Sequence, residues 1–137
     1  MTQFRDEYIL QSPMSVPEGV AFDSKTGRFF ATGLLSGAVT AVDAATGEER
    51  PFYMPTGQPQ QLSGVKVDEV RRRLWVCASE IQRMWGGLLV FDVDTGAQLG
   101  SFELSRAGIC NDVALDAAGV AYVTDSFQPV IYRVDLQ

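Results

Sequence analysis

The sequence contains no histidine among its 137 residues, and this absence excludes more chemistry than any other feature of its composition. Without histidine there is no Ser-His-Asp or Cys-His arrangement for nucleophilic catalysis, and no histidine-ligated zinc or haem. A glycine-rich phosphate-binding loop is missing as well. Most common enzyme chemistries are therefore excluded by composition alone.

Cysteine is almost as scarce, with only Cys77 and Cys110 in the sequence. Both lie in β-like segments, and two cysteines are too few for a disulfide scaffold. We therefore expect reduced thiols and a cytoplasmic location. Cys110 has no histidine to act as its base, so we expect a buried structural thiol there and not a nucleophile.

Long apolar runs and clustered positive charge are also missing. No run of 18 apolar residues is present, and the acidic N-terminal stretch lacks an apolar signal core, so we expect neither a membrane partner nor export. The formal net charge is −6 at pH 7, which would repel a phosphate backbone and argues against nucleic acid as a partner. The basic run Arg71-Arg72-Arg73 is interpreted as a solvated turn.

What the sequence does contain is one short motif that is repeated three times, at residues 17–23, 62–68 and 110–116. The second copy begins 45 residues after the first, and the third begins 48 residues after the second. Each copy is followed by two further β-rich runs, at residues 28–32 and 38–43, 74–78 and 88–92, and 121–125 and 130–135. Four-stranded repeats of this period are typical of β-propeller blades.

The outer strands of the blades complete this prediction. They are expected near residues 50–54 and 99–104, while the third copy lacks one and a spare β-like run precedes the first copy at residues 4–10. A strand from one end that completes a blade from the other end is how propellers avoid exposed edges. We predict an all-β fold, a single unit 1–137 with a closing strand in residues 1–10 and blades at 17–55, 60–106 and 109–137.

Three blades are too few for a closed ring, because propellers typically close with four to eight. Two chains arranged head to tail would form a six-bladed ring in which each N-terminal strand closes the last blade of its partner, and we expect this homodimer. The alternative is that the sequence is a fragment of a longer propeller.

Polar residues stand where the first strands of the predicted blades begin. Glu18 opens the first strand of the first blade, and Asn111 and Asp112 open that of the third. Because the first strands run in the same direction, their starts are expected at one mouth of the central channel.

Three further residues are expected near this mouth. The connection over residues 79–87 is predicted to be a long loop that carries Arg83 and Trp85 as a substrate wall, with local packing of Trp85 as the alternative. Asp125 ends a second strand, where a substrate contact and a turn cap are both open.

The sequence resembles the senescence marker protein/gluconolactonase/luciferin-regenerating enzyme family in Pro17-Glu18-Gly19-Val20, in Cys110-Asn111-Asp112-Val113-Ala114-Leu115-Asp116 and in Ala121-Tyr122-Val123-Thr124-Asp125-Ser126. The resemblance covers nearly the whole chain but only half of the six-bladed ring of that family. It implies one divalent cation in the channel, and hydrolysis of a lactone or ester.

The resemblance also implies roles for individual residues. Glu18 and Asn111 match metal ligands, and Asp112 matches the acid that acts as a base. Carboxylate and amide oxygens suit Ca²⁺, the cation we expect first, and also Mg²⁺ or Mn²⁺. The second blade departs from the pattern, because Ser63 stands where a stronger ligand is expected.

Two functions therefore remain open. The first is a metal-dependent hydrolase of lactone or ester bonds acting on a small molecule. The second is a non-enzymatic propeller that binds a small molecule or a protein. An ordered metal between Glu18 and Asn111 would favour the first, and a water-filled channel would favour the second.

Overall fold

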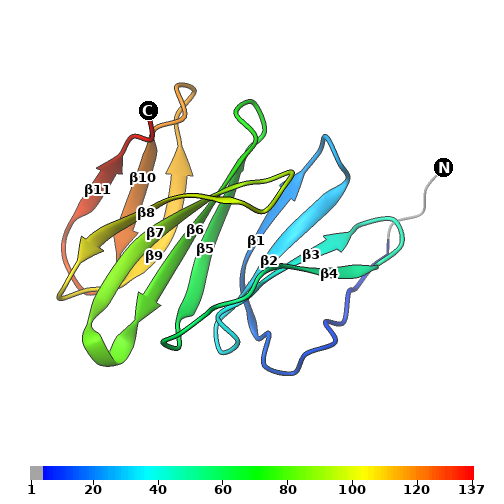
Figure 1. The fold of residues 1–137 in the computed structure, drawn as a ribbon, viewed down its shortest axis with the longest axis horizontal. Coiled ribbons are helices and arrows are strands. Elements are labelled where there is room, and N and C mark those ends of the chain that lie inside the picture. The colour runs from blue at the N-terminus through cyan, green and yellow to red at the C-terminus, as the bar shows by residue number, and fades with distance from the viewer. Residues whose placement is uncertain (1–4) are drawn as a thin grey trace.

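The computed structural model describes residues 5–137, which form three antiparallel sheets that lie side by side (Figure 1). Sheet 1 contains β1 (Pro17–Asp23), β2 (Arg28–Gly33), β3 (Val39–Asp43) and β4 (Glu49–Tyr53). Sheet 2 contains β5 (Gln61–Asp68), β6 (Arg73–Glu80), β7 (Trp85–Asp92) and β8 (Gln98–Ser105). Sheet 3 contains β9 (Cys110–Leu115), β10 (Ala121–Asp125) and β11 (Ile131–Val134). The predicted all-β fold is confirmed, with strands that follow one another in sequence order.

The hairpin turns after the third strands of sheets 1 and 2 are built in the same way. Asp43 Oδ1 accepts two backbone N–H groups of its own turn at 2.9 and 2.8 Å, and Asp92 Oδ1 makes the same pair of bonds at 2.9 and 2.8 Å. These bonds lower the pKa of both carboxyl groups. Gly47 and Gly96 then take φ values of 75° and 78°, a region that strongly favours glycine.

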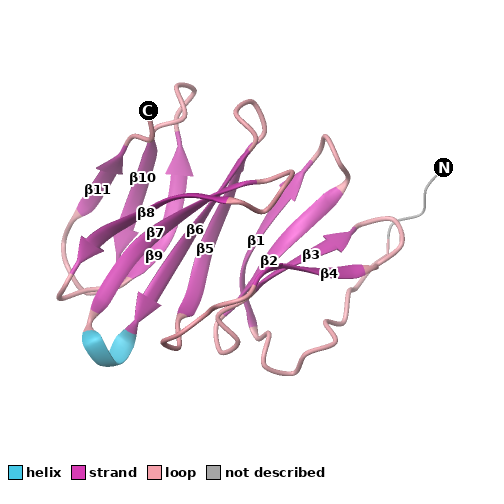
Figure 2. Ribbon diagram, in the orientation of Figure 1, coloured by secondary structure: helices cyan, strands magenta, loops and turns pink. Residues whose placement is uncertain are grey.

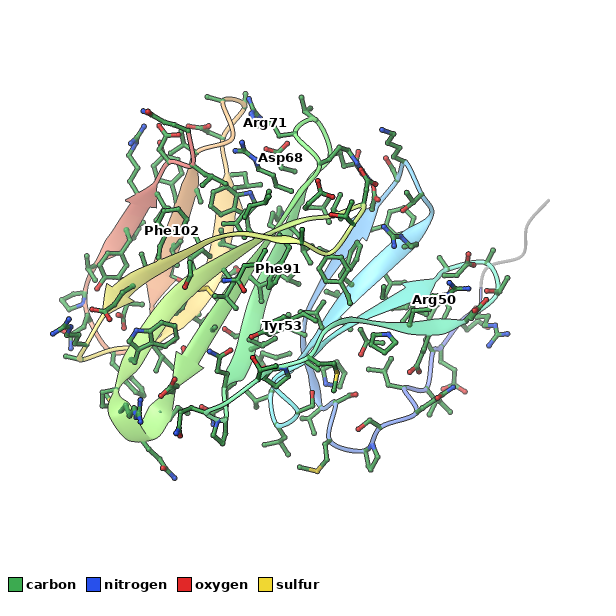
Figure 3. The ribbon with its side chains drawn as sticks, viewed as in Figure 1. Arg50, Tyr53, Asp68, Arg71, Phe91 and Phe102 are labelled. Carbon is green, nitrogen blue, oxygen red and sulfur yellow. A yellow bond between two sulfur atoms is a disulfide. The ribbon has the colours of Figure 1, made fainter. Side chains whose placement is uncertain are left out.

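Sheet 2 is buried on both faces. Leu74, Val76 and Phe91 pack in a cluster with sheet 1, whereas Trp75 packs in a cluster with sheet 3. Because successive side chains of a strand point to opposite faces, burial on both sides gives β6 and β7 their nearly continuous apolar sequences. The rings of Phe91 and Tyr53 have centroids 5.0 Å apart, so the outer strand β4 also leans on sheet 2 (Figure 3).

The arginine run at residues 71–73 is not a solvated turn, which corrects the expectation from the sequence. Each of the three residues is partly buried. Arg71 donates to the carbonyl oxygen of Ala117 at 3.1 Å, and Arg73 donates to that of Leu136 at 3.0 Å. Two of the three arginines therefore attach sheet 3 to sheet 2.

Arg72 points the other way and attaches sheet 1. Its guanidinium group donates to both carboxylate oxygens of Asp23 at 2.8 Å each, and to Asp94 at 2.7 and 3.0 Å. The side chain of Asp23 has 0% exposed surface. The hydrogen bonds from Arg72 are the main reason why the pKa of this buried carboxyl group falls to about 2.

The two cysteines form a disulfide between Cys77 of β6 and Cys110 of β9, which overturns the prediction of reduced thiols. Both residues lie in the core between sheets 2 and 3. The sequence separation of 33 residues gave no sign of this pairing, which depends on how the two sheets pack. Disulfides are typical of oxidising compartments, so the cytoplasmic location stays a prediction that this bond weighs against.

The connection between β6 and β7 is shorter than predicted. Instead of a long loop over residues 79–87, the strands pair as far as Glu80 and Trp85, with one 3₁₀ turn, Ile81–Arg83, between them (Figure 2). The loop prediction was wrong, because Gly86 lies within β7. A Cβ atom on Gly86 would come within 2.8 Å of the Cys110 nitrogen, so glycine at this position lets β9 approach closely. Residues 5–137 contain no helix long and apolar enough to cross a membrane.

The N-terminal segment lies on sheet 1 without forming a strand in residues 5–16. The closing strand was predicted over residues 4–10, of which residue 4 lies outside the described part of the chain together with residues 1–3. Tyr8 donates its hydroxyl to the carbonyl oxygen of Ala44, and its ring packs on Phe29 with centroids 4.9 Å apart. A strand needs a neighbour with which to pair its backbone, so its closing role stays a prediction.

We expect acid to weaken the clamp between sheets 1 and 2. Because the folded-state pKa of Asp23 is lowered from 3.8 to about 2, this carboxylate stabilises the fold above the unfolded value, and the stabilisation is lost as the pH falls through the folded value. The loss corresponds to roughly 2 kcal/mol. Urea unfolding between about pH 5 and about pH 2 should show this loss. It should be smaller in Asp23→Asn and unchanged in Glu48→Gln, which alters an exposed carboxylate.

The disulfide gives a second test of the fold. Protein unfolded in urea without reductant should show no free thiol. Reduction should lower the free energy of unfolding by about 2–4 kcal/mol, because the bond restricts the unfolded chain. A variant with Cys77→Ser and Cys110→Ser should no longer respond to reductant. Two free thiols in the isolated protein would contradict the pairing.

Candidate functional site

Three residues selected from the sequence line one depression of about 240 Å³ where the first strands of the sheets begin. Glu18 comes from β1, and Asn111 and Asp112 come from β9. All three are exposed. The depression crosses all three sheets, because β1 lies beside β5 and β5 lies beside β9.

Glycine lets the starts of these strands approach closely. A Cβ atom on Gly64 would lie 2.6 Å from the Cα of Asp112 and 2.7 Å from the carbonyl oxygen of Asn111. A Cβ atom on Gly19 would meet the carbonyl oxygen of Ser63. Larger residues at these two positions would push the strands apart, so the glycines set the spacing of the site.

Hydroxyl groups fix the same strands to one another. Thr32 Oγ1 donates to the carbonyl oxygen of Ser63, and Ser63 Oγ donates to that of Cys110 at 2.9 Å. Ser63 occupies the repeat position held by Glu18 and Asn111 in the other two sheets. Its hydroxyl binds backbone, so we assign Ser63 to holding sheet 3 and not to binding a ligand.

Asp112 is oriented by its own strand. Its Oδ1 accepts the backbone N–H of Val113 at 2.8 Å, and its backbone N–H donates to Thr124 Oγ1 at 3.2 Å. The carboxylate is therefore held at the rim of the depression while the residue stays exposed. A carboxylate in this state can accept a proton from a bound water or substrate.

The donor set suits a hard cation but is incomplete in one chain. Glu18 offers carboxylate oxygens and Asn111 an amide oxygen, the ligand types that Ca²⁺, Mg²⁺ and Mn²⁺ prefer. Within residues 5–137, no group of three or more Asp, Glu, His or Cys side chains is close enough to hold a metal. Because Ca²⁺ takes about six to eight oxygen ligands, further ligands would have to come from water or a second chain.

Trp85 and Arg83 do not share this depression. The 3₁₀ turn lies at the same end of the sheets as the starts of β1, β5 and β9 (Figure 2), but both residues line a separate hollow with Glu103. Trp85 Nε1 donates to Glu103 Oε2 at 3.2 Å, and Arg83 pairs with Glu80 at 3.5 Å. Local packing of Trp85, one of the two interpretations from the sequence, describes its contacts.

Asp125 organises the loops at the ends of β9 and β10. Its Oδ1 accepts backbone N–H groups from Ile109 at 3.2 Å, Phe127 at 2.8 Å and Gln128 at 3.1 Å. These bonds fit the turn-cap interpretation of Asp125. They hold the strand start that carries Asn111.

Two threonines that were not selected from the sequence also support the site. Thr32 Oγ1 accepts the N–H of Gly19 at 2.9 Å, just as Thr124 Oγ1 accepts that of Asp112. The two threonines stand at matching positions in the second strands of their sheets. Their matching place in the second run of the repeat is the sequence signal that marks them.

Comparisons with known proteins add to this geometry. No family model and no curated protein sequence matches the chain. A solved gluconolactonase from Xanthomonas campestris is similar in structure, with a TM-score of 0.65, 22% identity and coverage of 89% of this chain and 38% of its own. A luciferin-regenerating enzyme has a TM-score of 0.64 and 16% identity, with coverage of 84% of this chain and 39% of its own. A chain in a nidogen/laminin complex has a TM-score of 0.72 and 18% identity, with coverage of 92% of this chain and 46% of its own.

These similarities define a class of fold. The protein is an all-β chain of three antiparallel sheets arranged like the blades of a propeller. The chain spans less than half the length of each of these three structures. At such identities the similarity extends to the fold and carries no activity with it.

Proposed function

We propose that this protein is a three-bladed half of a six-bladed propeller and that it hydrolyses lactone or ester bonds with the help of a divalent cation. The observation that carries the proposal is the shared depression of Glu18, Asn111 and Asp112 at the strand starts. The fold that the chain shares with a gluconolactonase and a luciferin-regenerating enzyme supports it.

Glu18 and Asn111 are the proposed metal ligands. Both are exposed side chains with oxygen donors, and they reach the depression from sheets at opposite ends of the array. Ca²⁺ is the first candidate, with Mg²⁺ and Mn²⁺ as alternatives. When bound, such a cation polarises a carbonyl group and acidifies water.

Asp112 is the proposed general base. The hydrogen bond from Val113 keeps its carboxylate at the rim, where it can take a proton from the attacking water. Trp85 and Arg83 are proposed to contact the distal part of a small-molecule substrate, because the 3₁₀ turn Ile81–Arg83 lies at the same end of the sheets as the strand starts (Figure 2). Asp125 then contributes indirectly, through the loop that positions Asn111.

A non-enzymatic propeller that binds a small molecule or a protein is the second candidate. The observation in its favour is that residues 5–137 contain no group of three or more Asp, Glu, His or Cys side chains arranged to hold a metal, so one chain lacks a full set of such ligands. The metal measurement below separates the two functions.

We expect a divalent cation to stabilise the folded protein. A cation that binds only the folded state at a hundred times its Kd adds about 2.7 kcal/mol. Thermal melts with millimolar Ca²⁺, Mg²⁺ or Mn²⁺ should show a higher Tm. Glu18→Gln should remove most of the rise, whereas Glu48→Gln, an exposed carboxylate paired with Arg50, should keep it. No shift with any of the three cations would contradict the metal site.

Loss of the proposed base should reduce turnover without unfolding the protein. Asp112→Asn keeps the shape and removes the proton acceptor, so kcat on lactones or simple esters should fall roughly 10²-fold or more. Asp135→Asn is the matched control, because that exposed carboxylate makes a weak 3.5 Å pair with Arg133. Full activity in Asp112→Asn, or activity that resists chelation, would exclude this mechanism. Inactivity of the metal-loaded protein on all such substrates would favour the binding function.

A further inference from the structure

We propose that sheet 3 of a second copy docks in the space between residues 5–10 and the open face of sheet 1, and that two such junctions close a ring of two chains. This inference rests on the proposed function, because the ring would complete the proposed site at the strand starts. Four features of the described residues support it.

The first feature is the position of the N-terminal segment. Arg5 lies over Gly47 and donates to the carbonyl oxygen of Thr46 at 2.6 Å. In sheet 2 the matching turn glycine, Gly96, has the backbone of Phe52 beside it, 3.6 Å from the position of a Cβ atom. Residues 5–8 thus lie on sheet 1 where β4, the outer strand of the preceding sheet, lies on sheet 2.

The second feature is a repeated bond from an arginine to a backbone carbonyl. Arg28 at the start of β2 donates to the carbonyl oxygen of Val93 in the next sheet at 3.0 Å. Arg73 at the start of β6 donates to that of Leu136 in the next sheet, also at 3.0 Å. Ala44 carries the corresponding carbonyl in sheet 1.

The Ala44 carbonyl receives its hydrogen bond from Tyr8. In a ring of two chains, the sheet before sheet 1 is sheet 3 of the partner subunit. At the arginine position, sheet 3 has Val120. Sheet 3 thus lacks the arginine that would donate to the Ala44 carbonyl oxygen, and the Tyr8 hydroxyl donates to that oxygen instead. Val120, with its short side chain, leaves room for this hydroxyl.

The third feature is an apolar gap beneath the N-terminal segment. A hollow of about 510 Å³ is lined by Tyr8 and Leu10 of this segment and by Val20 and Phe22 of β1. Val20 is 68% exposed and Phe22 is 50% exposed. The matching faces of the other two sheets are buried against their neighbours, so this face has the character of a junction without its second half.

The fourth feature is the outer face of sheet 3. Ile131 is 68% exposed and Tyr122 is 39% exposed there. Thr124 repeats the contacts of Thr32 with its own sheet, but within the described residues it lacks the third contact, the bond of Thr32 to Ser63 of the next sheet. The partner residue in the place of Ser63 would be Glu18 of the partner subunit.

One difference from the internal junctions bears on the site. Gly19 and Gly64 allow close approach at those junctions, whereas the matching position in sheet 3 is Asp112. Its side chain keeps the inner ends of the two subunits further apart. Asn111 and Asp112 would then face Glu18 of the partner subunit across a wider gap, which leaves room for a cation or substrate.

The mass in solution tests the proposal. Light scattering of the chain in a chelator should give twice the 15.0 kDa of one chain. Because no metal is present, failure of the metal site leaves this result untouched, and a monomer that binds metal would overturn only the docking. A single-chain mass, or aggregates of no fixed size, would overturn the dimer and leave additional sheets of a longer chain as the cover.

Substitutions on the two faces assign the junction. Ile131→Lys and Val20→Glu should each give a folded monomer, because both side chains are exposed in the single chain. Val70→Lys is the control, since Val70 is 85% exposed in a turn away from both faces, and it should stay dimeric. Circular dichroism should show native β-structure in all three.

Mixing the two monomeric variants is the most stringent measurement. A mixed ring contains one junction with both substitutions and one junction with neither, so the dimer mass should return with one copy of each chain. Native mass spectrometry distinguishes the mixed dimer from each parent. Folded variants that remain monomeric when mixed, or a monomeric control, would overturn the assignment of these faces.

Discussion

Arg72 joins two sheets through a carboxylate with no exposed surface, and the arrangement of the first two sheets depends on this contact. Removing one partner of a buried ion pair costs about 3–5 kcal/mol, because the other charge is left without compensation. Arg71 and Arg73, on either side, bond to backbone oxygens of sheet 3. The turn between β5 and β6 thus fixes the positions of both neighbouring sheets, at the end of the strands that lies away from the site.

The site at the opposite ends of the strands depends on this relative placement of the sheets. Gly64 brings β5 against β9, and the hydroxyl groups of Thr32 and Ser63 bond across the sheets. The disulfide from Cys77 to Cys110 fixes the residue just before Asn111. The depression that holds Glu18, Asn111 and Asp112 is therefore formed by backbone geometry, and the side chains with the chemistry are left exposed.

The two ends of the array differ in a way that links assembly to function. The open face of sheet 1 is apolar and partly covered by residues 5–10, while sheet 3 exposes Tyr122 and Ile131. One chain supplies two or three oxygen-bearing side chains to the depression, fewer than a calcium ion requires. Closure of a ring would bring the second set, so metal affinity and assembly are expected to change together.

The sequence by itself determined the three repeated units of antiparallel strands, their order and the polar residues at the strand starts, but not the state of residues 5–10, which form no strand. Repeated phrases and turns such as that of Asp92 and Gly96 depend on local backbone preferences, which are readable from neighbouring residues. The tertiary structure decided what depends on distant partners: the disulfide of Cys77, the role of Arg72 and the strand that replaced the loop at Gly86. Such contacts arise when sheets pack, and no short stretch of sequence contains both of their halves.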